Sequence, residues 1–335
     1  IRKRDDRTIR FYSLNFTNNG IITTSLDDLV PSEAAGWTND PKGVMWTFER
    51  RGYHLTAGAD ILIYGDIPAG SGLSSSASLE VLTGLMLRDT FGFDISMIDL
   101  ALIGQYSENN FNGMNCGIMD QFASAMGKKN HAIFLNCKTM EFKHVPLDLK
   151  GYKIVITNTN KKHKLADSKY NERRSECEKG FEILKKALPN TTCLGDISPA
   201  EFEANKQLIA DPTVLKRVTH VICEDDRVLR SIDALEKGDI EAFGQLMNES
   251  HDSLRDLYEV TGIELDTLAS EARKVEGVLG SRMTGAGFGG CTVSLVKEDG
   301  VDEFIEKVGK EYLDKIGYAA SFYITEIGDG GREIK

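Results

Sequence analysis

A run of ten mostly small residues between two regular segments is the feature that most constrains the fold. Residues 68–77 read Pro-Ala-Gly-Ser-Gly-Leu-Ser-Ser-Ser-Ala, and they follow a predicted apolar strand at Leu55–Tyr64. A predicted helix, Ser75–Thr90, comes directly afterwards. In a strand–loop–helix unit of this kind, backbone N–H groups and the helix N-terminus can surround phosphate oxygens. We expect the inner face of the helix to carry Leu79, Leu82 and Met86.

The composition of this loop supports an anion site. Gly70 and Gly72 can adopt backbone angles that other residues avoid, which lets the chain curl around a phosphate. Hydroxyl groups at Ser74, Ser75 and Ser76 can add hydrogen-bond donors or a magnesium ligand. The structural alternative is an ordinary glycine/serine turn in which a serine caps the helix.

Two better-known phosphate-binding motifs do not fit. A Walker A loop needs Gly-Lys-Ser/Thr, and no lysine occurs between Lys42 and Lys128. A second glycine stretch, residues 282–291, contains the spacing G-x-G-x-x-G, but we expect the helix Ile263–Val275 before it and the strand Thr292–Leu295 after it. A Rossmann motif needs the reverse order. We expect this loop to pack its backbone against a neighbouring domain or ligand, and a flexible turn is the alternative.

Composition excludes several classes of partner. The chain has 40 basic and 51 acidic residues, a formal net charge of -11, and no basic cluster suited to nucleic acid. No apolar run reaches the roughly 20 residues that span a bilayer, and the first residues lack the apolar stretch of a signal peptide. We therefore expect a cytoplasmic protein with no membrane partner. The six cysteines are expected to be reduced core thiols: Cys116, Cys137, Cys177, Cys193, Cys223 and Cys291.

Length and pattern predict two domains, 1–155 and 156–335, of which the first is mixed and the second is rich in helices and closed by a β-α-β unit. Strands are expected at Ile9–Leu14, Leu55–Tyr64, His131–Asn136, Glu141–Leu147, Tyr152–Asn158, Cys291–Val296 and Ala320–Ile327. Helices are expected at Ser75–Thr90, Ser96 to about Asn110, Asp167–Leu188, Pro199–Ile209, Val214–Lys237, Asp239–Val260, Ile263–Val275 and Val301–Ile316.

Carboxylates are sparse in the segment between the two glycine loops. Asp120 lies among Ile118, Met119 and Phe122, where an unpaired carboxylate would be costly to bury, so we expect something to hold it. It is either a capping or salt-bridged residue, or a base or anchor for a substrate hydroxyl beside a γ-phosphate. Glu108 by itself is typical of a solvated helix charge.

Taken together, these segments resemble the galactokinases, a branch of the GHMP small-molecule kinases, over nearly the whole chain. Residues 68–77 are similar to the second motif of that family, P-x-G-x-G-L-S-S-S-A. Residues 116–122, Cys-Gly-Ile-Met-Asp-Gln-Phe, resemble the segment that carries the catalytic aspartate, and Ser281–Val293 resembles the third motif. The resemblance implies an α+β, two-domain GHMP kinase fold. Its N-terminal domain would be ribosomal-protein-S5-like, and its C-terminal domain would be ferredoxin-like with added helices.

The resemblance also implies a function and a site. A galactokinase phosphorylates the C1 hydroxyl of galactose with ATP and Mg²⁺, giving galactose 1-phosphate and ADP as the first committed step of galactose catabolism. By resemblance Asp120 is catalytic, Gly117 and Tyr170 contact the sugar, and Trp37 lies beside adenine. Ser76 and Glu108 would ligate magnesium, with Ser75 in reserve. The ATP site would comprise Trp37, Pro68, Gly70, Ser71, Gly72, Leu73, Ser74, Ser75 and Ser76.

One family motif is missing from this chain. Galactokinases open with a signature like G-R-V-N-L-I-G-E-H-T-D-Y, whose arginine pairs with the catalytic aspartate and whose acidic residues bind sugar hydroxyls. The chain instead begins with a strand-like alternation, Arg7–Leu14, as if cut inside a domain. We expect this exact chain to have little or no kinase activity, because Asp120 lacks its guanidinium partner, and the intact protein to be active.

Other functions stay open at this point. Another GHMP kinase, acting on N-acetylgalactosamine, mevalonate or homoserine, is the nearest alternative. A catalytically silent sensor of galactose and ATP is a second, although sensors tend to lose residues of the phosphate loop and residues 72–77 are complete here. A Rossmann oxidoreductase needs the strand–loop–helix context that we do not expect around residues 282–291. We expect a monomer with galactose and ATP as its ligands.

Overall fold

The computed structural model describes residues 1–67, 73–161 and 166–334, which form two compact units. The first unit comprises residues 1–67, 74–144 and 327–334. The second comprises Leu73 together with residues 145–161 and 166–326. The boundary that the sequence suggests, 1–155 against 156–335, refers to the domains of the family and stays a prediction.

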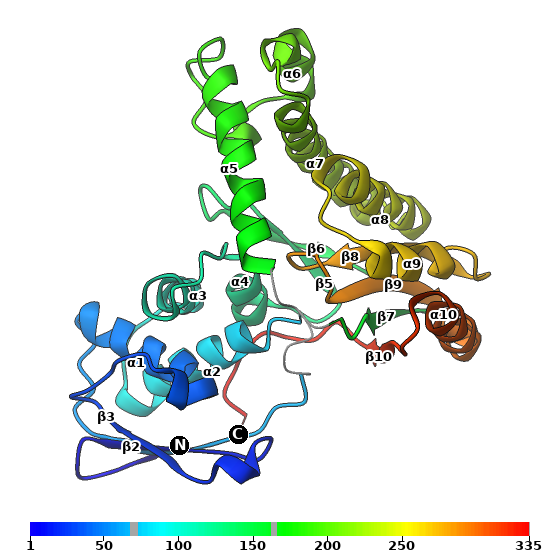
Figure 1. The fold of residues 1–335 in the computed structure, drawn as a ribbon. Coiled ribbons are helices and arrows are strands. Elements are labelled where there is room, and N and C mark those ends of the chain that lie inside the picture. Colours follow the sequence, from blue (N-terminus) through cyan, green and yellow to red (C-terminus); the bar gives the residue numbers. More distant parts are fainter. Residues whose placement is uncertain (68–72, 162–165, 335) are drawn as a thin grey trace. The chain divides into compact units, whose positions relative to one another are not determined.

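A four-stranded sheet in the order β1-β4-β2-β3 forms the base of the first unit (Figure 1). The two central strands, β2 and β4, run parallel with Ile9 opposite Ala59, and the edge strands pair antiparallel with them. Alternate residues of β2 are buried, as the alternation in the sequence predicts. The strands are β1 (Arg2–Lys3), β2 (Thr8–Ser13), β3 (Ile22–Ser25) and β4 (Ala59–Ile63).

Four α-helices lie in the described residues of the first unit, and side chains from three of them bury the inner face of this sheet. Phe11 of β2 is fully buried with Val44, Met45 and Phe48 in the largest hydrophobic core of the unit. A two-stranded sheet is formed by β5 (His131–Leu135) and β6 (Phe142–Pro146). The helices are α1 (Asn39–Arg50), α2 (Ser75–Phe91), α3 (Met97–Ser107), which continues into a π-helical turn at Glu108–Asn112, and α4 (Met119–Met126).

Helix α1 was not predicted from the sequence. Pro41 and Gly43 lie near its start and read as helix breakers. Pro41 is tolerated because the first N–H groups of a helix have no intrahelical partner. Gly43 is needed for packing, because a Cβ built there would lie 2.2 Å from the Oγ of Ser107 on α3. The close packing of α1 on α3 therefore requires glycine at this position, although a glycine usually indicates the end of a helix.

The start of α2 agrees with the prediction, but its buried face does not. The helix packs against α1, α3 and α4, so it is buried on several sides (Figure 1). The buried apolar side chains are Ala77, Val81, Leu85 and Leu87, whereas Leu82 is 46% exposed. The predicted inner face of Leu79, Leu82 and Met86 is wrong, because a helix with neighbours on several sides has no single apolar stripe.

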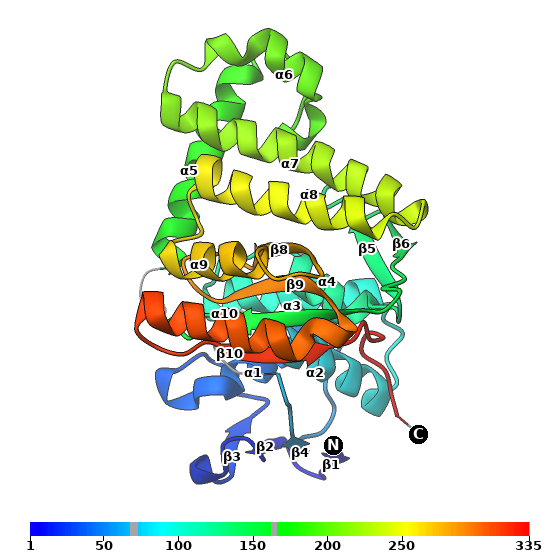
Figure 2. The ribbon, with the colours of Figure 1, turned by 90° about the vertical axis from the view of Figure 1, so that its right-hand side faces the viewer.

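The second unit contains an antiparallel sheet in the order β10-β7-β9-β8. Figure 2 shows α9 and α10 packed on each other and against this sheet, and α7 and α8 lying side by side. The predicted β-α-β closure is confirmed by β9, α10 and β10. The strands are β7 (Tyr152–Asn158), β8 (Val278–Thr284), β9 (Cys291–Lys297) and β10 (Ser321–Thr325).

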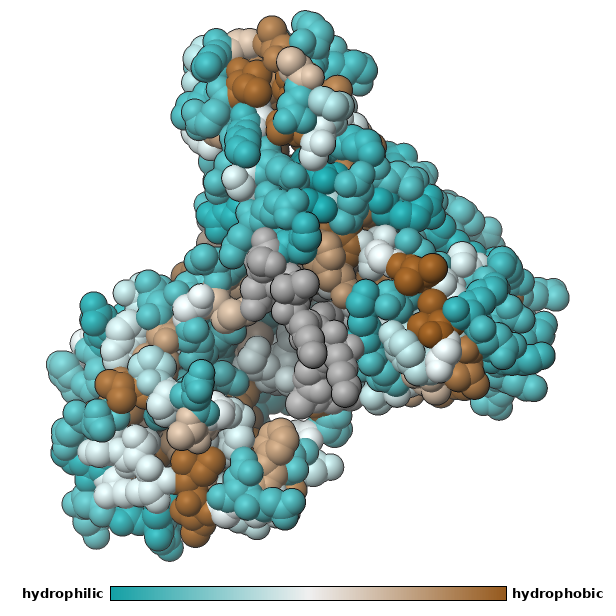
Figure 3. Space-filling view, viewed as in Figure 1, coloured by the Kyte–Doolittle hydropathy of each residue, from teal (hydrophilic) through white to brown (hydrophobic). Residues whose placement is uncertain are grey.

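The predicted helices of this unit are all present: Val301–Ile316 has the predicted ends, and the others are shifted at one or both ends. Asp211 caps α7 by accepting hydrogen bonds from the N–H groups of Thr213 and Val214. On the face shown in Figure 3, hydrophilic residues cover most of these helices, and some hydrophobic residues gather near α6. The helices are α5 (Ala166–Leu184), α6 (Pro199–Asn205), α7 (Pro212–Glu236), α8 (Ile240–Ser253), α9 (Ile263–Ala272) and α10 (Val301–Ile316).

The edge strand β8 is covered by α8 rather than left open. The Asn248 side chain accepts from the N–H of Ser281 at 2.9 Å, and Nδ1 of His251 accepts from the N–H of Met283 at 3.1 Å. A Cβ built on Gly280 would lie 2.1 Å from the carbonyl oxygen of Gly244, so the two backbones touch. Side chains of α8 thus take the place of a fifth strand and protect the edge from other chains.

Two sequence expectations concern the whole chain. None of the helices in the described residues has the length and hydrophobicity needed to cross a lipid bilayer. None of the six cysteines forms a disulfide bond, as expected, but they are not all core residues. Only Cys291 is buried, and Cys137 is exposed in the turn between β5 and β6, so the prediction of core thiols is wrong for Cys137.

A buried histidine in the second unit makes stability depend on pH. His220 of α7 is 5% exposed, lies 2.8 Å from the Oγ of Ser253 through Nδ1, and stacks on Tyr258. Burial lowers the pKa of His220 to about 4, and the nearby guanidinium groups of Arg217, Arg227 and Arg282 add to the shift against the opposing effect of Glu224. In the unfolded chain this imidazole is therefore protonated as the pH falls below about 6.5, whereas in the folded chain it is protonated only below about pH 4.

We predict that this histidine costs stability as the pH falls from about 6.5 to about 4, by about 3 kcal/mol in total. Above pH 6.5 both states are neutral at this residue, and no cost arises. His220→Gln should remove that part of the pH dependence. Urea unfolding of both proteins at pH 7 and pH 4.5 measures it, and an equal loss of stability in the two proteins would contradict the assignment.

Candidate functional site

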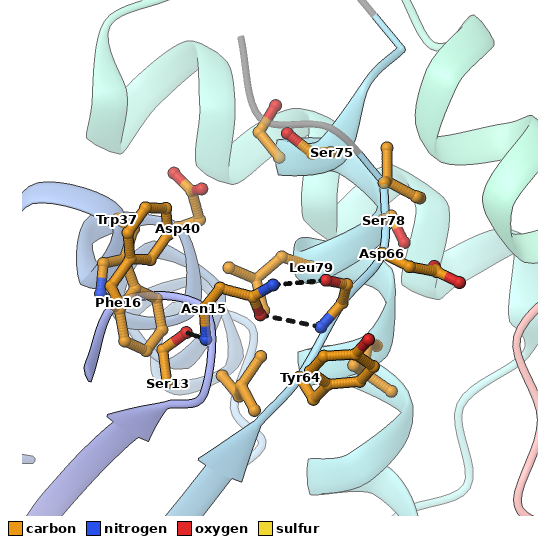
Figure 4. Close-up of a pocket in the computed structure, with 15 residues that line it drawn as sticks. Ser13, Asn15, Phe16, Trp37, Asp40, Tyr64, Asp66, Ser75, Ser78 and Leu79 are labelled. Atoms are coloured by element: carbon orange, nitrogen blue, oxygen red, sulfur yellow. Dashed lines mark hydrogen bonds between the residues drawn. The ribbon is translucent and has the colours of Figure 1, made fainter. Parts of the chain in front are cut away.

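A cavity of about 590 Å³ opens in the first unit where β2 and β4 end and α2 begins (Figure 4). Parallel strands end on the same side of a sheet, so residues that follow β2 and β4 reach the same space. The start of α1 supplies the remaining wall. The cavity is lined by Ser13, Asn15, Phe16, Trp37, Asp40, Ile63, Tyr64, Gly65, Asp66, Ile67, Ser75, Ser76, Ser78, Leu79 and Leu82.

The side chain of Asn15 joins the two chain segments that follow β2 and β4 and line the cavity. Asn15 Nδ2 donates to the carbonyl oxygen of Gly65 at 2.5 Å, and the N–H of Gly65 donates to Asn15 Oδ1 at 2.9 Å. The dashed lines in Figure 4 show this pair. The carboxamide acts as a strand partner for one residue and keeps the ends of β2 and β4 together beyond their last backbone bonds.

Aromatic and aliphatic side chains make up most of the cavity wall. Trp37 lies at its edge, with the ring packed edge-to-face on buried Phe11 at a centroid distance of 6.0 Å. Figure 4 shows Trp37 and Phe16 together on one side, with Tyr64 lining another part. Flat, mostly apolar walls with few polar groups suit a planar heteroaromatic ring such as a nucleobase. Trp37, which the resemblance places beside adenine, lines this apolar part of the wall, and its role stays a prediction.

The start of α2 faces the same cavity. Ser74 precedes the helix with a left-handed backbone, φ 58° and ψ 40°, and its side chain makes no capping hydrogen bond. The serine-cap alternative to a phosphate site is therefore not realised. Ser75 and Ser76 line the cavity, and the first N–H groups of a helix favour an anion. Pro68, Gly70, Ser71 and Gly72 lie outside the described residues.

Three carboxyl groups meet next to the cavity, a cluster that the sequence analysis did not predict. Asn112 Nδ2 donates to Glu108 Oε2 at 2.7 Å and to Asp40 Oδ1 at 3.3 Å. The third group, Glu80 of α2, is 1% exposed. Gln121 Nε2 donates to Glu80 Oε2 at 3.0 Å. Helices α1, α2 and α4 and the turn after α3 thus converge through polar side chains.

Burial changes the protonation of two of these groups. Burial, with Glu108 nearby, raises the pKa of Asp40 to about 7. The same two causes raise the pKa of Glu80 to about 10, so Glu80 is protonated at neutral pH. Glu80 lies among Ala77, Val81 and Gly84 on a buried face of α2. An acid at helical spacing with small apolar residues was the signal in the sequence that could have identified it.

Asp120 does not sit as the sequence analysis expected. It is the acidic residue in the first turn of α4, where the helix dipole favours a negative charge. Its side chain is half-buried, and Met119 beside it is 61% exposed. Among the described residues it makes neither an ion pair nor a hydrogen bond, so the expected partner is not found there. An apolar neighbourhood in sequence does not imply burial, because residues 119 and 120 face outward at the start of the helix.

The remaining predicted residues fall in different places. Gly117 is exposed, and no atom of the described residues lies within 4 Å of a Cβ built there. Its φ lies outside the left-handed region as well, so neither packing nor backbone shape in the described residues requires glycine. Tyr170 lies on α5 of the second unit and is 37% exposed. Leu73 is half-buried and is assigned to the second unit.

The second glycine loop lies between two strands. The expectation that a helix leads directly into residues 282–291 is wrong, because β8 comes between α9 and the glycines. The Rossmann order is still excluded, since β9 and not a helix follows. The loop backbone packs closely on its own unit: the N–H of Phe288 donates to the carbonyl of Val260 at 2.6 Å, and a Cβ on Gly287 would lie 2.2 Å from that oxygen. The expected packing against a neighbouring domain or ligand stays a prediction.

Comparisons with known proteins identify the family of the chain. The family model of the GHMP kinases N terminal domain matches residues 39–128, and the model of the GHMP kinases C terminal domain matches residues 231–315. Galactokinases of Clostridium acetobutylicum and Fusobacterium nucleatum are 55% and 52% identical to the chain, covering 100% of it and 86% of their own length.

Solved structures show the same relation. The crystal structure of Lactococcus lactis galactokinase complexed with galactose superposes with a TM-score of 0.95 at 44% identity, over 99% of this chain and 86% of that one. A mevalonate kinase with 18% identity and a TM-score of 0.64 shares the fold. The two-domain GHMP kinase fold predicted from the motifs is confirmed. By sequence and structure, the chain belongs to the GHMP kinases and, within that family, to the galactokinases.

Proposed function

We propose that this protein transfers the γ-phosphoryl group of ATP to the C1 hydroxyl of galactose, giving galactose 1-phosphate and ADP. The observation that carries the proposal is the cavity at the start of α2, which joins an aromatic wall to an uncapped helix N-terminus. A nucleobase fits the first and a phosphate chain fits the second. The galactose bound to the Lactococcus lactis relative supports the choice of sugar.

The nucleotide would lie along this cavity from Trp37 to Ser76. Adenine would pack beside Trp37 and Phe16, and the phosphates would take hydrogen bonds from Ser75, Ser76 and the first N–H groups of α2. The resemblance adds Pro68, Gly70, Ser71, Gly72, Leu73 and Ser74 to the phosphate site. The left-handed backbone of Ser74 turns the chain sharply before the helix and supports that assignment.

Glu108 and Ser76 are the residues that would hold Mg²⁺. Among the described residues, no group of three or more histidine, cysteine, aspartate or glutamate side chains could hold a metal ion. Mg²⁺ in kinases commonly takes one or two carboxylates and completes its oxygen ligands with phosphates and waters. A hydroxyl and a carboxylate fit that pattern, and Asn112 orients Glu108 through its 2.7 Å hydrogen bond. When bound, the ion would neutralise charge on the phosphates.

The chain's own residues would then place the sugar. Asp120 would orient the C1 hydroxyl and accept its proton as phosphoryl transfer proceeds. Its half-exposed position suits this role, because a carboxylate in contact with a substrate cannot be sealed in the core. Gly117 would let the sugar approach the backbone, and the open space above its Cα supports this. For Tyr170 the support is the resemblance alone.

We also propose that the protein acts as a monomer in the cytoplasm. None of the six cysteines forms a disulfide bond, and the reducing cytosol maintains that state.

A substrate panel tests the proposed function. With protein expressed from its complete coding sequence, ADP release in the presence of ATP and Mg²⁺ should depend on galactose. N-acetylgalactosamine, mevalonate and homoserine should support far less turnover. Turnover with one of those substrates instead would assign the protein to another GHMP kinase activity. Binding of galactose and ATP without ADP release would indicate a sensor rather than an enzyme.

Glu108→Gln is predicted to raise the Mg²⁺ concentration needed for half-maximal rate by about tenfold. The amide is a weaker ligand than the carboxylate, while its shape and the neighbouring Asn112 are kept. Titrating Mg²⁺ at saturating ATP and galactose measures this shift. The control is Glu141→Gln, because Glu141 is exposed next to β6. If the two variants need the same Mg²⁺ concentration, Glu108 is not a ligand.

A further inference from the structure

The segment between the π-helical turn and α4 carries one proposed sugar contact and leads to the other. It runs from Gly113 to Ile118 and has no regular secondary structure. Gly113, with φ 77°, ends the turn, and the N–H of Met114 donates to the carbonyl of Glu108 at 2.9 Å. An irregular segment needs other partners for its backbone groups if it is to keep one conformation.

A single side chain supplies such partners. The N–H of Cys116 donates to Asn109 Oδ1 at 2.8 Å, and Asn109 Nδ2 donates to the carbonyl of Cys116 at 3.4 Å. Gln105 Nε2 adds a second donor to that carbonyl at 3.3 Å. Asn109 thus engages both backbone groups of one residue, as an opposite residue does in a hydrogen-bonded antiparallel pair.

The first turn of α4, which follows this segment, is held in place by Gln121. Gln121, 3% exposed, donates to Glu80 at 3.0 Å and reaches toward the sulfur of Cys116 at 3.9 Å. Gly117 and Asp120 lie between these two anchored residues, and neither has a side-chain partner of its own among the described residues. Their positions are therefore set through Cys116 on one side and Gln121 on the other.

The contact is unlike the usual bond of an asparagine in a helix. Asn110, the neighbouring residue, donates from Nδ2 to the carbonyl of Tyr106 four residues earlier at 3.0 Å, within its own helix. Asn109 instead reaches seven residues forward, to a segment that forms no helix or strand. Asn109 is also half-buried while Asn110 is exposed. The two adjacent asparagines thus have different partners: Asn110 bonds within its own helix, and Asn109 bonds to the irregular segment.

We propose that Asn109 is a positioning residue for the phosphoryl acceptor: through Cys116 it holds Gly117 and Asp120 in the geometry that binds the sugar. This inference rests on the proposed function, because it assumes that Gly117 and Asp120 contact galactose. It assigns no contact between Asn109 and either substrate. Loss of the two hydrogen bonds between Asn109 and Cys116 should therefore weaken galactose binding and turnover. The proposed nucleotide cavity, which Asn109 does not line, should stay unchanged.

The test compares Asn109→Ala with Asn110→Ala in protein expressed from its complete coding sequence. Asn109→Ala should raise the KM for galactose about tenfold and lower kcat, with the KM for ATP within twofold of the parent. Amide exchange of the peptide that spans residues 113–118 should accelerate by a similar factor. Asn110→Ala should leave all of these values within twofold.

A second variant covers the case in which Asn109→Ala fails to fold. Asn109→Asp keeps the acceptor for the N–H of Cys116 and loses the donor, so a smaller rise in the KM for galactose is expected. Unchanged galactose kinetics in a folded Asn109 variant would overturn the inference, and so would an equal rise in both KM values. A parent enzyme that shows no galactose-dependent turnover would overturn the proposed function and this inference together.

Discussion

Asp120→Asn is expected to lower kcat for galactose phosphorylation by about a thousandfold while ATP binding is preserved. The amide has the shape of the carboxylate but cannot accept the proton of the C1 hydroxyl. Asp120 makes neither an ion pair nor a hydrogen bond among the described residues, so its replacement should not disturb the fold. It also does not line the nucleotide cavity. Steady-state kinetics and equilibrium binding of ATP to the same preparation measure the two effects.

Asp99→Asn is the matched control for this variant. Asp99 is likewise an acidic residue in the first turn of a helix of the same unit, where its carboxylate accepts from the Oγ of Ser96 at 2.7 Å. The charge lost at the helix N-terminus is therefore similar in the two variants. Asp99→Asn should keep kcat within about twofold of the parent. Substantial turnover by Asp120→Asn would refute the catalytic role of Asp120.

Arg217→Met is expected to destabilise the second unit by about 3 kcal/mol. Arg217 of α7 is 2% exposed, and its guanidinium donates to Glu176 at 2.8 Å and to Glu259 at 2.8 Å. It also donates to the carbonyl of Leu257 at 2.7 Å, one of the orphan carbonyls at the end of the turn after α8. Methionine fills the space but removes the donor of the Leu257 carbonyl. It also leaves Glu176 and Glu259 with one charged partner fewer each, which is costly where the group is buried.

The measurement is thermal or urea unfolding of the parent and two variants. A loss of this size should lower the midpoint of thermal unfolding of the unit by about 6 to 12 °C. Lys216→Met is the control, because Lys216 also pairs with Glu259 at 2.9 Å but is 48% exposed. An exposed pair of that kind contributes less than about 1 kcal/mol. If the two variants lose the same stability, burial of Arg217 does not increase its contribution to the free energy of unfolding.

Local pattern predicted most of the regular structure. The alternation around Ile9, the run of small residues before α2 and the apolar spacing of the long helices are all short-range signals, and the structure contains the corresponding elements. Elements without such a signal were missed. Helix α1 contains Pro41 in its first turn and Gly43 at its contact with α3, and local rules read both residues as helix breakers. Strand β8 contains Gly280, whose backbone touches that of Gly244.

Some residues of the candidate site were likewise predicted from the sequence, and others were not. Trp37, Ser75 and Ser76 could be assigned from motifs, and they do line one cavity. The carboxyl cluster of Asp40, Glu80 and Glu108 could not be foreseen. Its members come from three separate helical segments, and their protonation follows from burial that the sequence does not display.

The amino-acid sequence by itself determined the family and the start of α2, because motifs and helix starts depend on residues a few positions apart. Tertiary structure alone decided which polar side chains support the site. Asn15 meets Gly65 and Gln121 meets Glu80 across 50 and 41 residues of chain, and no periodicity in the sequence connects such pairs. They form because packed helices and parallel strands bring distant backbones together, and a buried polar group must then find its partner there.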